Sequence, residues 1–328
     1  MHVTILGGGG FLGRKLAARL ARDGALGGRA VSGLTLFDLN APAAPDGAPF
    51  PVRCLAGDIA APAALENAIP EGTDVVFHLA AVVSAAAEAD FALGMRVNLD
   101  GTRNLVERCI GLSRPPRVVF TSSVASFSGG QAAVLPDDAR QVPANSYGAQ
   151  KAMGELLLSD ASRKRFLDAV NIRLPTVIVR PGRPNKAASS FFSAILREPL
   201  LGLETDLPVG DDFGVWVCSP RQAVEWFLHA ATMDTGPLGL DRGINPPGLR
   251  ATVGKMLAAL RAVGGEEAAS RVRRTPDPAI EAIVSGWPAA FTAERARRLG
   301  FPEQEGLEAV VRAFVEDDLA ATRAERGL

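Results

Sequence analysis

The stretch HVTILGGGGFLGRKLAARLARDG, residues 2–24, decides the fold that we expect for this chain. Its first part, residues 2–7, is a short run of apolar and β-branched residues that predicts a buried strand. Its last part, residues 10–24, repeats leucine at the spacing of one helix face. Four consecutive glycines lie at the junction, and glycine lets the backbone turn tightly and approach a ligand. The stretch predicts a strand, a glycine turn and a helix.

The glycine turn also predicts a dinucleotide-binding site. The G-x-G-x-x-G spacing is satisfied by Gly8, Gly10 and Gly13, and the G-x-x-G-x-x-G spacing by Gly7, Gly10 and Gly13. Either spacing brings the backbone close to a pyrophosphate, which the free N–H groups of the following helix N-terminus would bind. The alternative is a tight strand–helix turn that binds nothing.

The alternation of strand and helix continues outward from this stretch. Further strands are expected at residues 34–38, 52–55, 74–80, 117–123 and 169–180. Helices are expected at about residues 90–111 and 145–167, and in the last third at about 188–198, 219–232, 252–263 and 292–299. Such alternation indicates parallel strands with helices on both faces. We therefore predict an α/β fold: a Rossmann-like doubly wound parallel sheet in residues 1–180 and a smaller, mostly C-terminal substrate lobe in 181–328. Some segments of the second part are expected to return to the sheet.

Composition excludes several other classes of protein. The net charge of −1 gives no global attraction to nucleic acid or to an anionic membrane. The longest apolar stretch, around residues 75–87, is too short to span a bilayer, and no signal peptide is apparent. The three cysteines and three histidines are scattered, which predicts no disulfide framework and no metal site. This pattern fits a reducing cytoplasm.

Two acidic residues follow predicted strands. Asp38 ends the second strand, where a carboxylate accepts hydrogen bonds from ribose hydroxyls and repels a 2′-phosphate. No cation follows directly in Leu39 and Asn40, so the sequence favours NAD over NADP. A turn-initiating aspartate is the alternative. Asp58 follows the third strand, where it either reaches the adenine or caps the helix expected near Pro62.

The only tyrosine, Tyr147, lies four residues before Lys151 at the start of a predicted helix. This spacing puts both side chains on one face. A free tyrosine has a pKa of about 10, and a nearby ammonium stabilises its phenolate, so the pair can act as a general base. Ser122 and Ser123 end a strand that delivers them to the same sheet edge as the glycine turn, and Asn98 could hold a water there. A surface helix that happens to carry Tyr and Lys is the alternative.

Eight segments, in order, resemble the extended short-chain dehydrogenases/reductases, the superfamily that includes NAD-dependent sugar epimerases and dehydratases. They are ILGGGGFLG, FDLN, GDI, VFHLAA, VNLDGT, VVFTSS, YGAQK and IRLPTV, all within the first 180 residues. The resemblance implies that Ser123 orients the reacting oxygen, with Ser122 as the competing choice. It also implies that Tyr147 is the acid/base, that Lys151 is its partner and that Asn98 lies at a helix kink. The NAD contacts that it implies are Gly7, Gly10, Phe11, Leu12, Gly13, Asp38, Asp58, Ile59, Leu79, Ala80, Ala81, Asn98, Tyr147, Lys151, Pro175 and Val177.

The segment RPGRPNKAASS, residues 180–190, predicts an anion site. It gathers three cations, an amide and two hydroxyls just before a predicted helix N-terminus. The anion would be a carboxylate or the diphosphate of a sugar nucleotide. A solvent-exposed basic loop is the alternative.

Residues 173–200, with 215–224 and 277–288, resemble a narrower group, the D-erythronate dehydrogenases, which oxidise a four-carbon sugar acid at C2 with NAD. The substrate contacts expected on this basis are Ser84, Ser123, Tyr147, Thr176, Arg183, Asn185, Ser190, Trp216 and Arg221, although Trp216 is equally a core residue. The alternatives are an NAD-dependent nucleotide-sugar epimerase or dehydratase and a non-catalytic NAD(H)-sensing regulator. The resemblance to the superfamily also implies a homodimer through the helices around 90–111 and 147–165.

Overall fold

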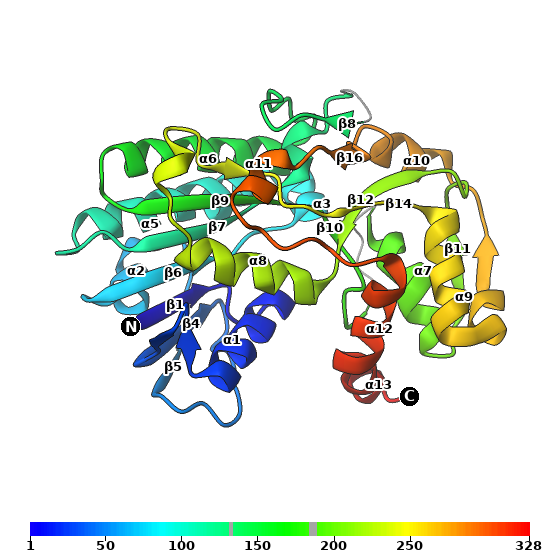
Figure 1. Cartoon of the computed structure of the whole chain (residues 1–328), viewed down its shortest axis with the longest axis horizontal. Helices are drawn as coiled ribbons and strands as arrows, with labels where there is room; N and C mark the ends of the chain where they lie inside the picture. The colour runs from blue at the N-terminus through cyan, green and yellow to red at the C-terminus, as the bar shows by residue number, and fades with distance from the viewer. Residues whose placement is uncertain (131–133, 184–188) are drawn as a thin grey trace. The chain divides into compact units, whose positions relative to one another are not determined.

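The computed structural model describes residues 1–130, 134–183 and 189–328. Two compact units make up the chain (Figure 1). Unit 1 contains Met1–Ser126, Asn145–Arg173 and Val224–Asn245, and unit 2 contains Phe127–Ala144, Leu174–Ala223 and Pro246–Leu328. The boundaries of the two units therefore do not correspond to a single division of the chain at residue 180. Residues 127–144 belong to unit 2, and residues 224–245 belong to unit 1.

Unit 1 is built around a seven-stranded sheet of order β13-β9-β7-β6-β1-β4-β5. Its strands are β1 (His2–Leu6), β4 (Gly33–Asp38), β5 (Val52–Ala56), β6 (Thr73–His78), β7 (Arg117–Ser123), β9 (Asp168–Leu174) and β13 (Gly243–Ile244). β1 pairs in parallel with β4 on one side and with β6 on the other. The chain runs outward from β1 through β4 and β5, then returns to β6 and continues the other way. The sheet therefore has a topological switch point at the carboxyl ends of β1 and β6, where ligands bind in open α/β sheets. The predicted doubly wound α/β fold is confirmed.

Helices cover both faces of this sheet (Figure 1). They are α1 (Phe11–Asp23), α2 (Pro62–Ala68), α5 (Gly101–Ile110), α6 (Ser146–Arg163) and α8 (Pro220–Thr232). One buried cluster joins α2, α5 and α6 to the sheet through Leu65, Leu105, Leu158, Val76 and Phe120. On the other face, α1 and α8 are linked by an ion pair between Arg19 and Glu225.

Two predicted elements are each divided in the structure. The helix expected at 90–111 consists of α4 (Phe91–Gly94), a π-helix η1 (Met95–Asp100) and α5. The strand expected at 169–180 ends at Leu174, and Thr176–Val177 form β10 in another sheet. Pro175 separates β9 from β10 because proline has no N–H to donate to a sheet ladder.

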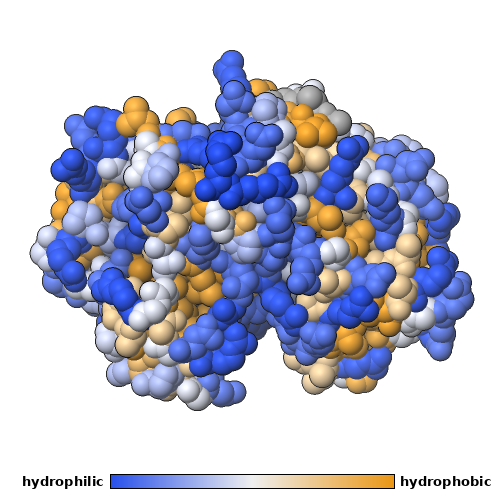
Figure 2. Space-filling view, viewed as in Figure 1, coloured by the Kyte–Doolittle hydropathy of each residue, from blue (hydrophilic) through white to orange (hydrophobic). Residues whose placement is uncertain are grey.

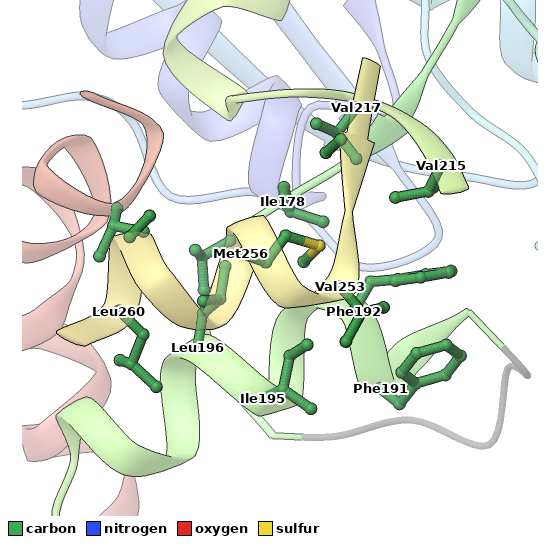
Figure 3. Packing of buried hydrophobic residues seen from close by; sticks show 14 of the residues in the cluster. Ile178, Phe191, Phe192, Ile195, Leu196, Val215, Val217, Val253, Met256 and Leu260 are labelled. Atoms are coloured by element: carbon green, nitrogen blue, oxygen red, sulfur yellow. The ribbon is translucent and has the colours of Figure 1, made fainter. Parts of the chain in front are cut away.

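Unit 2 has its own core (Figure 3). A three-stranded sheet of β10, β12 (Gly214–Cys218) and β14 (Leu249–Thr252) packs with α7 (Ser190–Leu200), α9 (Val253–Ser270) and α12 (Leu307–Asp317). Figure 3 shows Ile195 and Leu196 of α7 beside Met256 and Leu260 of α9. Shorter elements complete the unit: β8 (Val134–Leu135), β11 (Thr205–Leu207), β15 (Val272–Arg274), α10 (Pro278–Val284), β16 (Ala290–Phe291), α11 (Glu294–Arg298) and α13 (Leu319–Arg326).

Hydrophilic and hydrophobic residues are interspersed over the face shown in Figure 2. Among the described residues, no helix combines the length and the apolar character needed to cross a bilayer.

Candidate active site

The glycine turn between β1 and α1 is closely packed at two of its glycines. Gly7 has φ +88°, and a Cβ there would lie 2.6 Å from the backbone nitrogen of Ala80. A Cβ on Gly13 would lie 2.2 Å from the carbonyl oxygen of Gly7. Gly10, between them, donates its N–H to the same oxygen at 3.2 Å. The geometry favours the spacing through Gly7, Gly10 and Gly13 over the one through Gly8.

The first turn of α1 fits a pyrophosphate. Gly10 is the N-cap and supplies no side-chain hydrogen bond, so the cap leaves the first N–H groups without a side-chain acceptor. A Cβ on Gly10 would meet only the Gly7 oxygen, at 3.4 Å. Phe11 and Leu12, predicted to contact the cofactor, are half-buried at the start of the helix. These groups would bind the anion through backbone N–H groups and the positive end of the helix dipole.

Asp38 ends β4 beside this turn. Its Oδ2 accepts the N–H of Gly9 at 2.9 Å, and its Oδ1 accepts the N–H of Leu39 at 2.8 Å. Because a carboxylate has about four acceptor positions, capacity remains for ribose hydroxyls. The structure therefore brings Asp38 to the glycine turn, as its predicted role requires.

Asp58 forms an ion pair that its sequence position did not suggest. It accepts the N–H of Ala60 at 2.9 Å and pairs with the guanidinium of Arg96. Burial opposes ionisation, but these two donors hold the pKa of Asp58 below its ordinary value. The capping alternative is wrong, because the N-cap of α2 is Ala61 and no side chain caps that helix. The next residue, Ile59, is buried against Gly101, where a Cβ would lie 2.8 Å from its Cγ2.

Asn98 lies in the π-helix, at the predicted kink. Its amide accepts the N–H of Val82 at 2.8 Å and donates to the carbonyl of Val82 at 3.0 Å and to Oε1 of Gln150 at 2.7 Å. The side chain thus fastens the segment after β6 to the start of α6, and local π-helices often mark functional sites. That segment holds the half-buried Leu79, Ala80 and Ala81, and Ser84 is the first residue of α3 (Ser84–Ala89).

The two serines at the end of β7 have different partners. Ser122 is buried, and its hydroxyl donates to the carboxylate of Glu155. Ser123 is half-buried, and its hydroxyl accepts the N–H of Ala125 at 3.1 Å. The Ser123 hydroxyl hydrogen is not used by that contact, whereas the Ser122 hydroxyl is directed into the protein. The geometry favours Ser123 as the group that orients a reacting oxygen.

The start of α6 is fixed against the segment that follows Ser123. Asn145 is the N-cap, and its side chain accepts the N–H of Gly148 at 2.8 Å. A Cβ on Gly148 would lie 2.2 Å from the carbonyl oxygen of Ala125, so only glycine permits this approach. Tyr147 is half-buried within this first turn. The fold therefore brings the turn that carries Tyr147 against the strand end that carries Ser123.

Lys151 is buried one turn further along α6, at 2% exposure. Its Nζ lies 5.6 Å from the centroid of the Tyr147 ring and 4.6 Å from that of Phe120. Burial lowers the pKa of Lys151 to about 7, while the negative charge of Glu155 opposes the shift. Burial, and then the charge of Lys151, lower the pKa of His78 to about 3, so this imidazole is neutral.

The predicted contact residues in unit 2 differ in their exposure to solvent. Pro175, Thr176 and Val177 are buried, Ser190 is half-buried at the start of α7, and Arg183 is exposed. Asn185 lies outside the described residues.

Trp216 and Arg221 both contact other side chains of unit 2. Trp216 is buried, and its ring centroid lies 6.2 Å from that of Phe291. Arg221 pairs with Glu316 at 2.9 Å and with Asp317 at 2.6 Å, and these bonds raise its pKa further. The predicted contact of Arg221 with the substrate stays a prediction. Across residues 1–130, 134–183 and 189–328, no group of His, Cys, Asp or Glu could hold a metal ion.

Sequence reasoning did not single out Glu155 or Arg173. Both are buried, and they pair at 2.9 Å. Two features of the sequence could have indicated them: a glutamate lies four residues after Lys151, and an arginine lies within a strand that is buried along almost its whole length.

Comparisons with known proteins identify the family to which this chain belongs. The model of the NAD dependent epimerase/dehydratase family matches residues 3–215. The chain is 49% identical to a D-erythronate dehydrogenase from Cupriavidus necator, over 97% of this chain and 98% of that protein. It is 41% identical to a D-erythronate dehydrogenase from Haemophilus influenzae, over 97% of this chain and 100% of that protein.

A solved structure described as the nucleoside-diphosphate-sugar epimerase from Agrobacterium tumefaciens is 46% identical to this chain. It has a TM-score of 0.92, and the match covers 98% of this chain and 95% of that one. The protein therefore belongs to the NAD-dependent epimerase/dehydratase family, and its predicted place among the extended short-chain dehydrogenases/reductases is confirmed.

Gly13→Ala is expected to destabilise the protein and weaken dinucleotide binding. The new Cβ would lie 2.2 Å from the Gly7 oxygen, so the turn and the helix must move apart. We expect a loss of about 1–3 kcal/mol in the free energy of unfolding and a lower affinity for NAD, measured by denaturant unfolding and calorimetry. Gly210→Ala is the control, since nothing lies within 4 Å of its added Cβ. Unchanged stability and affinity in Gly13→Ala would contradict the packing argument.

Proposed function

We propose that this protein oxidises the C2 hydroxyl of a small sugar acid of the D-erythronate type to the 2-oxo acid, with NAD as the acceptor. The observation that carries the proposal is the 49% and 41% identity to two D-erythronate dehydrogenases over 97% of this chain, which includes the substrate half as well as the cofactor half. The site described above supports an oxidation, because a phenol, a buried ammonium and a serine hydroxyl lie at the carboxyl edge of a dinucleotide-binding sheet.

The chain's own residues would perform the proton chemistry. Gly7, Gly10, Gly13 and Asp38 would hold NAD, which supplies the hydride acceptor when it is bound. Ser123 donates a hydrogen bond to the substrate's C2 oxygen and orients it. Tyr147, as phenolate, accepts the proton of the C2 hydroxyl, and the Lys151 ammonium stabilises that phenolate.

The substrate carboxylate would be bound by the segment at residues 180–190. Arg183 is exposed and able to reach an anion, and Ser190 begins α7. Thr176 and Ser84 are proposed to contact the substrate hydroxyls. A charge-assisted contact to a guanidinium discriminates a carboxylate from a neutral sugar.

A nucleotide-sugar epimerase is the second candidate. It is favoured by the 46% identity to the solved structure described as a nucleoside-diphosphate-sugar epimerase. The two candidates differ in net redox change, because the dehydrogenase releases NADH and an epimerase does not. Incubation with NAD and a panel of four- to six-carbon aldonates, beside UDP-sugars, separates them. NADH formed from an aldonate supports the proposal, whereas epimerised UDP-sugar without NADH contradicts it.

Replacement of Asp38 is expected to change the cofactor preference. Asp38→Ser replaces the carboxylate that would accept from the ribose hydroxyls by a shorter, neutral hydroxyl, and it removes the charge that repels a 2′-phosphate. We expect kcat/KM with NAD to fall by about 10- to 100-fold, the cost of one lost charged hydrogen bond, and the NADP/NAD activity ratio to rise. Asp46→Ser, at an exposed loop position, is the control. An unchanged cofactor ratio would show that Asp38 does not contact the ribose.

We also propose a homodimer. Leu156 on α6 is 70% exposed, Phe91 in α4 is 64% exposed and Ile110 at the end of α5 is 51% exposed, all on the helices expected to form the interface. Leu156→Glu is therefore expected to shift a dimer toward monomer in light scattering. A wild-type protein that is monomeric at micromolar concentration would contradict the proposal.

We also propose a cytoplasmic location, since Cys54, Cys109 and Cys218 are free thiols.

A further inference from the structure

We propose that Glu155 is a positioning residue of the active site, which holds the serine-bearing strand end against α6 and keeps Lys151 protonated. The inference rests on the proposed function, since it concerns how that site maintains its base. The carboxylate of Glu155 is buried and takes no part in the proposed proton transfer.

Glu155 connects three elements of unit 1. It lies on α6 at 3% exposure, and its carboxylate accepts the hydroxyl of Ser122 from the end of β7. Arg173 on β9 donates to it through Nε, at 3.2 and 3.0 Å, and through Nη2 at 2.9 Å. Figure 1 shows α6 running along β7 and β9. One carboxylate therefore ties the helix that carries Tyr147 and Lys151 to two neighbouring strands.

The arginine itself is placed by a third strand. A Cβ on Gly243 of β13 would lie 2.3 Å from Nη2 of Arg173, so the guanidinium occupies space that only glycine leaves open. A buried ion pair is costly to break because the remaining charge has no compensation, so the arrangement is held in one geometry. The bond from Ser122 to Glu155 then fixes the strand end next to Ser123.

Glu155 also lies one helical turn beyond Lys151, on the same face. Among the described residues, the other groups near Lys151 that carry charge or titrate are Tyr147 on α6, His78 at the end of β6 and, behind Glu155, Arg173. Tyr147 and neutral His78 supply no negative charge when the phenol is protonated. Glu155 then supplies the negative charge that favours the ammonium form of Lys151. Without that charge, burial would lower the pKa of Lys151 further. The Tyr147 phenolate would then lose the neighbouring positive charge that stabilises it.

The test separates the charge of Glu155 from its role as a tether. Glu155→Gln removes the charge but keeps an acceptor for Ser122, whereas Ser122→Ala removes the tether and keeps the charge. NMR of ε-¹³C-lysine follows the titration of Lys151 in the NAD-free protein, with Lys151→Met identifying its signal among the five lysines. In Glu155→Gln we expect the midpoint of the Lys151 titration to fall by about one pH unit or more, because an adjacent opposite charge is lost. In Ser122→Ala we expect this midpoint to stay at the wild-type value.

Activity gives the second readout. In Glu155→Gln, kcat/KM near neutral pH should fall by about 10- to 100-fold and recover toward high pH, because the acidic limb of the profile moves upward. In Ser122→Ala, kcat should fall, but the acidic limb of the pH profile should stay at its wild-type position. An unmoved Lys151 midpoint in folded Glu155→Gln overturns the proposal, whatever the substrate proves to be, because the NMR titration needs none.

A further variant decides the matter where Glu155→Gln does not fold. Arg173→Met removes the competing cation, so Glu155 acts on Lys151 alone and the Lys151 midpoint should rise. A midpoint that stays at the wild-type value in Arg173→Met overturns the proposal. The opposite directions expected for Glu155→Gln and Arg173→Met are not produced by a general loss of packing.

Discussion

Tyr147→Phe is expected to abolish turnover while leaving the fold and NAD binding nearly intact. The substitution removes one hydroxyl from a half-buried ring whose carbon atoms keep their contacts. Loss of a general base costs on the order of 10³-fold in kcat, because the substrate hydroxyl then has no positioned acceptor for its proton. Steady-state kinetics measures the loss, and calorimetric titration with NAD measures retained binding.

Ser146→Ala is the control for this variant. It changes the neighbouring hydroxyl in the same helical turn and should retain most of the wild-type kcat. Because Tyr147 is the only tyrosine, no other phenol in the chain can take over its role. Full activity in Tyr147→Phe would remove the phenol from the proposed mechanism.

Lys151→Met is expected to inactivate the enzyme and, below neutral pH, to stabilise the protein. Burial lowers the pKa of Lys151 from 10.5 to about 7, which corresponds to at most about 5 kcal/mol. Below about pH 7 the lysine is protonated in both the folded and the unfolded chain, so the folded protein bears the full cost of a buried ammonium. Methionine has a similar length and no charge.

The stability of the wild-type protein is expected to depend on pH through Lys151. Above about pH 10.5 the lysine is neutral in both states and the cost disappears, so this group raises the stability of the wild type as the pH rises from about 7 to 10.5. The advantage of Lys151→Met is therefore largest below about pH 7 and shrinks at higher pH. Urea unfolding across this range measures it. Lys164→Met, at the exposed end of α6, should show no such trend, and a pH-independent difference for Lys151→Met would contradict the buried ammonium.

Local patterns predicted much of the fold and of the cofactor side of the site. The glycine turn, Asp38, Tyr147 and Lys151 are recognisable because each has a fixed place relative to one strand end or one helix start. Parallel strands bring those places to one edge, so their spatial proximity follows from the alternation of strand and helix.

Contacts between distant residues explain what the sequence did not predict. Asp58 binds an arginine from the π-helix and a turn N–H, neither of which its sequence position suggested, while its predicted contact with the adenine stays a prediction. The ion pairs of Arg221 were not predicted, because its carboxylate partners lie about 95 residues later in the chain. Glu155 was overlooked because its role depends on Arg173, 18 residues away, and on Ser122, 33 residues away.

A deuterium-transfer measurement tests the central claim most directly. D-Erythronate carrying deuterium at C2 is incubated with the protein and NAD, and both products are analysed by mass spectrometry. The account predicts reduced cofactor that contains the deuterium and a 2-oxo acid that has lost it, with slower turnover than for unlabelled substrate. Deuterium retained in the oxidised acid, or no reduced cofactor at all, would contradict oxidation at C2.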